Sequence, residues 1–344
     1  MSPNRAGGVV LSERSESWFD SLRSLTTIPS EPTGRVEGSK DDERGAPRGS
    51  GGRHWLTPAF LRRLETLQLS VRWVRGGSRL GGRFPMNRRG SSIEFAEHAP
   101  YAAGDDIRAI DWNLYARLDR LFVKTYKEEI ELSVDLFVDA TASMALPTPE
   151  KFERATQLAV CLGYIALAGR HYVRWSWVQP GPLGPRPSYF QRRDLPRLLQ
   201  EGERGAVRGQ TGLADWTRRA AAQLRLRGGQ VVLITDGMHR VADFFRAMHL
   251  LRVRNLEVKI VQVLSPQELH PARLLRGHRL VDAETGAVHQ LDYAPAELER
   301  AVLEHNEQLV RFCKRHGILF VQHHLDEPLE SFVMRTLPRH RFLE

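Results

Sequence analysis

Short apolar runs alternate with helical patterns along the C-terminal two thirds of the chain. The apolar runs at 134–138, 173–178, 231–235, 258–264 and 318–323 have the length and content of buried strands. Apolar residues recur at helical spacing over 149–169, 213–226, 241–253, 295–316 and 328–337. Buried strands that alternate with helices are typical of a mostly parallel sheet covered on both faces. We therefore predict a doubly wound α/β domain over residues 131–344.

Two segments depart from this alternation. Apolar stretches flank a turn-forming Glu-Thr-Gly sequence at 284–286, which predicts a hairpin insertion near residues 270–292. Within the first 52 residues, the segment 29–52 is rich in Pro, Gly and Ser and contains few large apolar side chains. Such a composition buries too little surface to offset the entropy of ordering. Residues 1–52 are therefore predicted to be a disordered tail.

A smaller β-rich and helical subdomain is predicted over residues 53–130. Thr57 and Pro58 have the character of a helix cap and first helical residue. Apolar residues at helical spacing continue this predicted helix to Gly76. Strand-like sequence follows at 92–95 and 121–126.

Positive charge is concentrated in one part of this subdomain. The chain carries a net charge of +9, and the segment from Arg53 to Arg89 holds nine arginines against the single Glu65. A basic segment of this kind suits an acidic protein surface, a nucleic acid or an anionic membrane. A solvated face beside a core helix is the alternative. The arginines that we consider for partner binding are Arg75, Arg83, Arg88 and Arg89.

Composition and motifs exclude several classes of protein. The sequence has no apolar run near the roughly 18 residues that a membrane span needs, and its N-terminus lacks the apolar stretch of a signal peptide. Only Cys161 and Cys313 occur, so a disulfide framework and a Cys-rich zinc site are excluded. There is no Walker A loop and no Gly-x-Ser-x-Gly motif. We expect a cytoplasmic protein, with peripheral membrane association as an open option.

Polar side chains gather where the predicted strands end. Asp139, Thr141 and Ser143 follow the first strand of the domain, Thr211 precedes the helix at 213, and Asp236 follows a later strand. In a doubly wound sheet, these positions share the carboxyl edge. Hard oxygen ligands of this kind suit Mg²⁺ or Mn²⁺. The alternative is that the two aspartates only cap strand ends and the helices that follow.

The order of these residues resembles the metal-ion-dependent adhesion site of von Willebrand factor A domains, which have a Rossmann-like fold. The matching pattern is Asp-x-Thr-x-Ser, then Thr, then Thr-Asp-Gly. The usual pattern has Ser where this chain has Thr141, and often Asp where it has Gly212. The resemblance implies that Thr141 and Ser143 ligate Mg²⁺, with Asp139, Thr211 and Asp236 binding directly or through water. An acidic side chain of a partner protein would then fill the open coordination position.

A second block, at residues 101–129, resembles the domain-of-unknown-function family 58. The residues that carry this resemblance are Gly104, Asp105, Asp106, Arg108, Asp111, Trp112 and Arg117. Because arginines are interleaved with the aspartates, we expect an ion-pair network that ties the block to the A-like domain, with Trp112 as its apolar anchor. Members of the family typically pair with an AAA+ ATPase of the MoxR type, which implies a chaperone-like role in the maturation or activation of other proteins.

The sequence thus favours a non-enzymatic, metal-dependent protein-interaction module that partners a MoxR-type ATPase. The first alternative is a divalent-metal-dependent hydrolase that uses Asp105, Asp106 and Asp111. The second alternative is a nucleic-acid-binding protein that uses the segment from Arg53 to Arg89. Nucleic acid is the less favoured partner, because Trp55 and Trp73 fall on or near the apolar face of the predicted helix.

Overall fold

The computed structural model describes residues 25–29, 53–70, 94–102, 107–127, 133–224, 229–254, 256–270, 278–282, 288–289 and 295–344. Contacts within the chain divide it into two compact units. The larger unit comprises Met1–Ser70 and Ser133–Glu344, and the smaller unit comprises Val71–Leu132. The segment 53–70, which we assigned to the smaller subdomain, therefore groups with the sheet domain.

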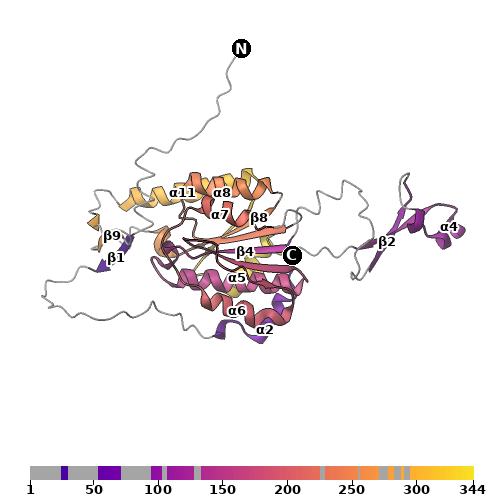
Figure 1. The fold of residues 1–344 in the computed structure, drawn as a ribbon, viewed down its shortest axis with the longest axis horizontal. Helices are drawn as coiled ribbons and strands as arrows, with labels where there is room; N and C mark the ends of the chain where they lie inside the picture. The colour runs from indigo at the N-terminus through magenta and orange to yellow at the C-terminus, as the bar shows by residue number, and fades with distance from the viewer. Residues whose placement is uncertain are drawn as a thin grey trace, which may run out of the picture. The chain divides into compact units, whose positions relative to one another are not determined.

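A six-stranded sheet lies at the centre of the larger unit (Figure 1). Its spatial order is β11-β8-β7-β4-β5-β6, and every neighbouring pair is parallel except the edge strand β6, which runs antiparallel to β5. The α/β prediction of a mostly parallel, doubly wound sheet is confirmed. The strands are β4 (Ser133–Asp139), β5 (Tyr172–Val178), β6 (Ser188–Tyr189), β7 (Gly229–Thr235), β8 (Glu257–Leu264) and β11 (Leu319–His324).

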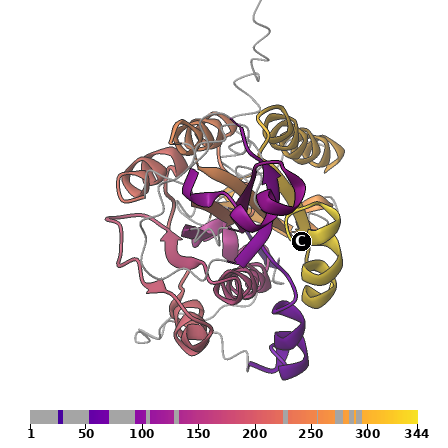
Figure 2. The same ribbon diagram turned by 90° about the vertical axis from the view of Figure 1, so that its right-hand side faces the viewer.

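Helices cover both faces of this sheet (Figures 1 and 2). One face packs against α5 and α6, and the other packs against α7, α8 and α11. Every residue of β4 and β7 is buried, which explains why these strands have continuous apolar runs rather than alternation. The main helices are α5 (Glu150–Ala168), α6 (Leu195–Arg204), α7 (Leu213–Ala221), α8 (Val241–Val253), α9 (Pro266–Leu269) and α11 (Pro295–Arg315). The sequence had not predicted α6, α9 or β6.

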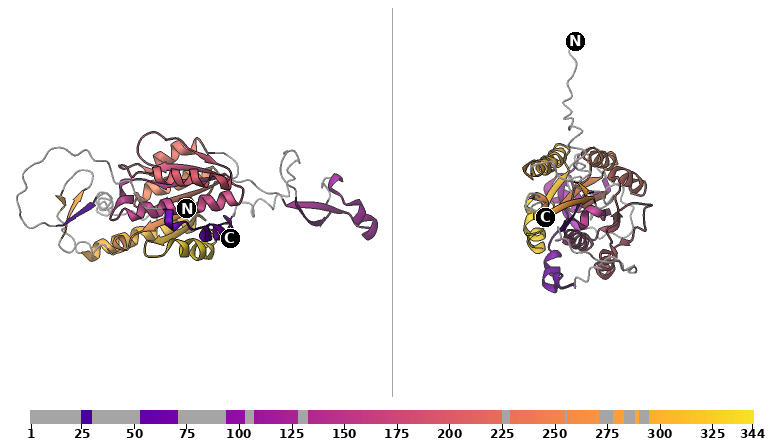
Figure 3. Two further views of the ribbon diagram at one scale, coloured as in Figure 1. Left: turned by 90° about the horizontal axis from the view of Figure 1, so that it is seen from below. Right: turned by 90° about the vertical axis from the view of Figure 1, so that its left-hand side faces the viewer.

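The helix predicted to reach Gly76 is much shorter in the structure. Helix α2 spans Pro58–Leu64, and its predicted cap is confirmed because Thr57 Oγ1 accepts a hydrogen bond of 3.1 Å from the amide of Phe60. Beyond the helix, the backbone of Gln68 exchanges two 2.8 Å hydrogen bonds with Glu344. Figure 3 shows the C-terminus beside this segment. Leu67, which continued the predicted helical spacing, is buried just before this distant pairing, so tertiary contacts override the local pattern.

The C-terminal helical region is divided into short pieces. The predicted helix at 328–337 consists of α12 (Leu329–Ser331), a π-helical turn (Phe332–Thr336) and α13 (Leu337–Arg339). Buried Phe332, Val333 and Leu337 join the core on the α5 side of the sheet. The C-terminal region therefore completes one of the two hydrophobic layers.

A separate three-stranded sheet contains the predicted hairpin. Strands β9 (His278–Asp282) and β10 (Val288–His289) pair antiparallel, as expected for the insertion. Strand β1 (Leu25–Pro29) pairs antiparallel with β9 over its full length. This strand falls inside the segment that the sequence assigned to the tail.

The smaller unit is built on one antiparallel strand pair. Strand β2 (Glu94–Pro100) pairs with β3 (Phe122–Lys127), with a register shift between Phe95 and Glu97. Helix α4 (Trp112–Leu118) and a short 3₁₀ turn (Ile107–Ala109) lie between the two strands in sequence. The strand predicted at 121–126 agrees with β3, whereas the strand predicted at 92–95 overlaps β2 only at Glu94 and Phe95, and β2 continues to Pro100.

Candidate functional site

The carboxylate of Asp139 stands at the carboxyl end of β4 and is completely buried. Its Oδ1 accepts hydrogen bonds from the amide of Thr141 at 3.0 Å and from Thr141 Oγ1 at 2.7 Å. Its Oδ2 accepts from Thr235 Oγ1 at 2.6 Å and lies 2.9 Å from His239 Nε2. In the tautomer that carries its hydrogen on Nε2, His239 donates to this oxygen. Asp139 thus has four donors around two oxygens, which is about its full accepting capacity.

The loop after β4 brings two hydroxyls together. Thr141 Oγ1 and Ser143 Oγ lie 3.1 Å apart, and Ser143 is the more accessible of the two. The amide of Ala142 donates to the carbonyl of Gly209 at 2.8 Å, which fixes this loop against the segment before α7. Thr211 is half-buried in that segment, and none of the hydrogen bonds of the described residues joins its hydroxyl to either aspartate.

Asp236 belongs to a neighbouring, equally buried cluster at the end of β7. Its Oδ2 accepts a 2.9 Å bond from Lys151 Nζ, and its Oδ1 accepts a 3.0 Å bond from the amide of Met238. Lys151 also donates to Glu268 Oε1 at 2.5 Å. The ammonium of Lys151 holds the pKa of the Asp236 carboxyl down at about 2, against the opposing effect of burial.

The pKa of Glu268 is raised, mainly because burial disfavours its charged form. The charges of Asp236 and Glu268 in turn raise the pKa of Lys151 and keep its ammonium charged, although desolvation is the largest opposing effect. The cluster is consequently an internal ion-pair network that carries its own cation.

These residues do not fit a resident Mg²⁺ ion held as the resemblance implies. The acceptor sites of Asp139 are filled by protein donors, and Asp236 faces the buried ammonium of Lys151. A dication at this place would displace those donors and approach a like charge in a low-dielectric environment. Within the described part of the chain, no group of three His, Cys, Asp or Glu residues is arranged to hold a metal ion. Of the predicted ligands, the three hydroxyl-bearing residues Thr141, Ser143 and Thr211 lack, among the described residues, an ion-pair partner of the kind that Lys151 provides for Asp236.

The family block is described only in part. Gly104, Asp105 and Asp106 lie outside the described residues. Asp111 caps α4, because its Oδ1 accepts from the amides of Asn113 and Leu114 at 3.0 and 3.2 Å, and its Oδ2 pairs with His98 Nε2 at 2.9 Å. The resemblance did not indicate this capping role.

The other described members of the block lie on the same small unit. Trp112 is 61% exposed and contacts Tyr115 edge-on, with 6.1 Å between ring centroids. Arg108 lies on the 3₁₀ turn and Arg117 in the last turn of α4. Their predicted contact with the A-like domain stays a prediction. The basic candidates Arg75, Arg83, Arg88 and Arg89 lie outside the described residues.

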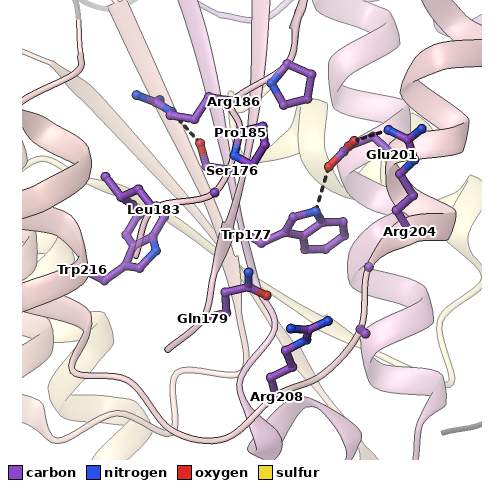
Figure 4. A pocket seen from close by; sticks show the side chains of 14 residues that line it. Ser176, Trp177, Gln179, Leu183, Pro185, Arg186, Glu201, Arg204, Arg208 and Trp216 are labelled. Atoms are coloured by element: carbon purple, nitrogen blue, oxygen red, sulfur yellow. Dashed lines mark hydrogen bonds and ion pairs between the residues drawn. The ribbon is translucent and has the colours of Figure 1, made fainter. Parts of the chain in front are cut away.

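The larger unit contains a cavity of about 460 Å³, and Figure 4 shows the side chains that line it. Trp177, Leu183 and Trp216 supply its apolar lining, and Arg204 and Arg208 are exposed cations in its wall. Trp177 Nε1 donates to Glu201 Oε1 at 2.9 Å, and Arg204 pairs with the same carboxylate at 3.7 Å. The amide of Arg208 donates to the carbonyl of Ala140 at 2.8 Å, so the cavity wall and the Asp139 loop form one continuous surface.

Sequence reasoning missed three members of the buried clusters, Lys151, His239 and Glu268. Glu268 could have been singled out from the sequence, because Ser265 and Glu268 have the spacing of a capping box, which they form at the start of α9. His239 follows Asp236 by three residues, but nothing local indicates that it turns towards Asp139. Lys151 is in the first turn of an amphipathic helix, where a lysine is ordinarily solvated.

A mostly parallel sheet with helices on both faces, and an Asp-Thr-Ser loop at its carboxyl edge, define a von Willebrand factor A-like domain. The chain belongs to the family described as "Protein of unknown function DUF58", whose model matches residues 97–308. This confirms the family resemblance seen in the sequence.

The chain is also similar to other proteins. The uncharacterized protein Rv1480 of Mycobacterium tuberculosis is 25% identical over 297 residues, which cover 83% of this chain and 90% of that protein. Among solved structures, the conserved hypothetical protein BatB from Bacteroides thetaiotaomicron is 12% identical, with a TM-score of 0.34 over 61% of this chain and 98% of that one. A von Willebrand factor type A structure from Catenulispora acidiphila is 17% identical, with a TM-score of 0.33 over 55% of this chain and 44% of that one.

In the described part of the chain, no helix combines the length and the apolar character that a membrane crossing requires.

Proposed function

We propose that this protein is a non-enzymatic protein-interaction module that binds its partner at the carboxyl edge of the sheet. The observation that carries the proposal is the surface formed by the Asp139 loop and the adjoining cavity. This surface combines apolar lining from the partly buried Trp177 and Leu183 with the exposed cations of Arg204 and Arg208. Concave apolar surface with a few polar groups is typical of a binding site, and Trp and Arg carry much of the energy at protein interfaces.

The arrangement of hydroxyls and imidazole supports binding rather than catalysis. Ser143 Oγ is paired with Thr141, whereas the imidazole of His239 faces Asp139 and lies 3.4 Å from Thr235 Oγ1. Within the described residues, no base is placed to activate Ser143 as a nucleophile. Asp111, which the hydrolase alternative needs, has both of its carboxylate oxygens engaged in capping and in the pair with His98.

We propose a MoxR-type AAA+ ATPase as the partner and a chaperone-like role for the pair. The family resemblance of the sequence supports this choice. The exposed arginines of the cavity wall favour an acidic contact region on that partner. Because the buried Asp139 and Asp236 do not fit a metal ion, we propose that the two proteins bind without a bridging metal.

The test is capture of the ATPase from a lysate of the native organism, with identification by mass spectrometry and a repeat with purified proteins. Arg208→Glu reverses a charge in the cavity wall, and Arg219→Glu makes the same change on the exposed side of α7. We expect the wild type and Arg219→Glu to retain the ATPase, and Arg208→Glu to lose at least about tenfold in affinity, as is common for truncated or reversed interface charges. Equal binding by both variants, or capture of nucleic acid without an ATPase, would contradict the proposal.

A further inference from the structure

The strongest feature that the proposed function leaves unused is the fully buried side chain of Lys151. We propose that its ammonium supplies, from within the chain, the positive charge that a metal ion supplies at the adhesion site which the sequence resembles. The carboxyl edge is therefore pre-formed without metal, and partner binding at this edge does not require Mg²⁺ or Mn²⁺. This inference goes beyond the proposed function, because it concerns how the binding edge is held together.

Lys151 connects three segments that follow different strands. It stands in the first turn of α5, which the loop after β4 leads into. Its Nζ lies 2.9 Å from Asp236, which follows β7, and 2.5 Å from Glu268 in α9, which follows β8. A metal ion in such a site likewise gathers oxygen atoms from separate loops. One ammonium with several hydrogen-bonding directions performs the same joining role here.

Each ion-pair partner of Lys151 is anchored by further bonds. Glu268 Oε2 accepts from the amide and the hydroxyl of Ser265 at 2.8 and 2.9 Å. The carbonyl of Asp236 accepts a 2.8 Å bond from Gln262 Nε2. The backbone of Gly237, at φ +74, then turns the chain sharply, and a Cβ there would lie 2.8 Å from Gln262 Nε2. The network therefore has defined positions and is not a loose surface ion pair.

The electrostatics oppose a second cation at the same place. Lys151 is fully buried and its Nζ lies between the carboxylates of Asp236 and Glu268, so it cannot turn its ammonium to water to make room for a metal ion. The repulsion between a dication and a buried ammonium is much stronger at low dielectric than in water. Asp139, the other carboxylate of the predicted site, is saturated by the donors described above. Removal of Lys151, by contrast, leaves Asp236 and Glu268 as uncompensated neighbouring carboxylates.

The first experiment titrates the full-length wild type with Mn²⁺, followed by electron paramagnetic resonance of the free ion, and with Mg²⁺, followed by calorimetry. We expect no saturable binding up to about 1 mM, which covers the affinities of weak functional metal sites. We also expect the same thermal unfolding midpoint in Mg²⁺ and in EDTA. One equivalent of Mn²⁺ bound below that concentration, and lost in Thr141→Ala, would overturn the inference.

The second experiment removes the internal cation. Lys151→Met should lower the unfolding midpoint, and Mg²⁺ should now raise that midpoint, because the two carboxylates lack a counter-charge. The double variant Lys151→Met/Asp236→Asn should regain stability relative to the single variant and should show no response to Mg²⁺. A single variant as stable as the wild type, with no response to Mg²⁺, would overturn the inference. If the single variant does not fold, recovery of folding in the double variant supports the inference, and failure of both leaves the wild-type titration to decide it.

Partner capture separates this inference from the proposed function. An ATPase retained equally in Mg²⁺ and in EDTA supports both proposals. An ATPase lost in EDTA supports the interaction role but overturns the metal-free mechanism. If no protein is captured in either buffer, the proposed function fails, and the metal titration still decides the role of Lys151.

Discussion

Acid should destabilise the sheet domain through one buried histidine, His323, near the end of β11. Its side chain is completely buried and packs against Phe332, with ring centroids 4.3 Å apart. The guanidinium of Arg154 lies 2.9 Å from Nε2. Because a guanidinium can only donate, Nε2 must be the unprotonated acceptor. The nearest carboxylate oxygen, on Glu327, is 3.9 Å from Nδ1, which is too far for a hydrogen bond.

The magnitude follows from the pKa of this side chain in the two states. Burial, and then the charge of Arg154, lower the pKa of His323 to about 3 in the folded protein, whereas the unfolded chain has the ordinary value of about 6.5. The unfolded state therefore binds the proton first as the pH falls. The stabilisation from a neutral His323 is fully present above about pH 6.5 and is lost progressively as the pH falls towards about 3. Between about pH 7.5 and pH 5, the loss amounts to about 2 kcal/mol.

The assay is urea unfolding at these two pH values, followed by tryptophan fluorescence, for the wild type and for His323→Gln. Glutamine keeps an oxygen that can accept from Arg154 and does not titrate. Other histidines contribute equally to both proteins, so the difference between their pH dependences isolates His323. We expect the wild type to lose about 2 kcal/mol more than the variant. Equal losses in the two proteins would refute the argument that His323 is held neutral by burial and by Arg154.

Three further substitutions test the helix cap, the core packing and the proposed binding surface of the larger unit. Thr57→Ala should destabilise the protein by about 1 kcal/mol in urea unfolding, because it removes the side-chain cap of α2, and no change would show that α2 is held by packing alone. Trp216→Ala should lower the free energy of unfolding by roughly 3 to 5 kcal/mol, because it empties a buried site whose neighbour Phe137 has its ring centroid 4.8 Å away. A loss below about 1 kcal/mol would contradict the close packing of these two side chains. Gly205→Ala should cost more free energy of partner binding than free energy of unfolding. The reason is that the new Cβ would lie 2.4 Å from Trp177 Cη2 and displace the indole from the cavity. An unchanged affinity would show that Trp177 is not part of the interface.

Regular elements with a clear hydrophobic period were predictable from the sequence. The helix predicted at 241–253 has the observed bounds of α8, and the predicted strands agree with β4, β5, β7, β8 and β11 to within one or two residues. The order of strands and helices also predicted the sheet type, since parallel strands need crossover connections. The predictions failed where distant segments decide the local structure, as at Gln68, Leu69 and Ser70, whose backbone pairs with the C-terminal residues instead of continuing the helix.

For the candidate site, the sequence determined which oxygen-bearing residues gather at the carboxyl edge. Asp139, Thr141 and Ser143 alternate with single alanines along the chain, so a single loop brings them together whatever the rest of the fold does. The structure then places Thr235 and Asp236 beside them, because β7 is the neighbour of β4, an order that the sequence analysis did not predict.

Only the tertiary structure decided how the charges of that edge are balanced. Lys151 and Asp236 are 85 residues apart, and Lys151 and Glu268 are 117 residues apart, so no local pattern could pair them. A lysine in the first turn of a helix can be solvated or buried, and the choice depends on whether the fold places carboxylates within hydrogen-bond distance. Electrostatic energy depends on separation in space and on burial, and neither quantity is contained in the spacing of residues along the chain.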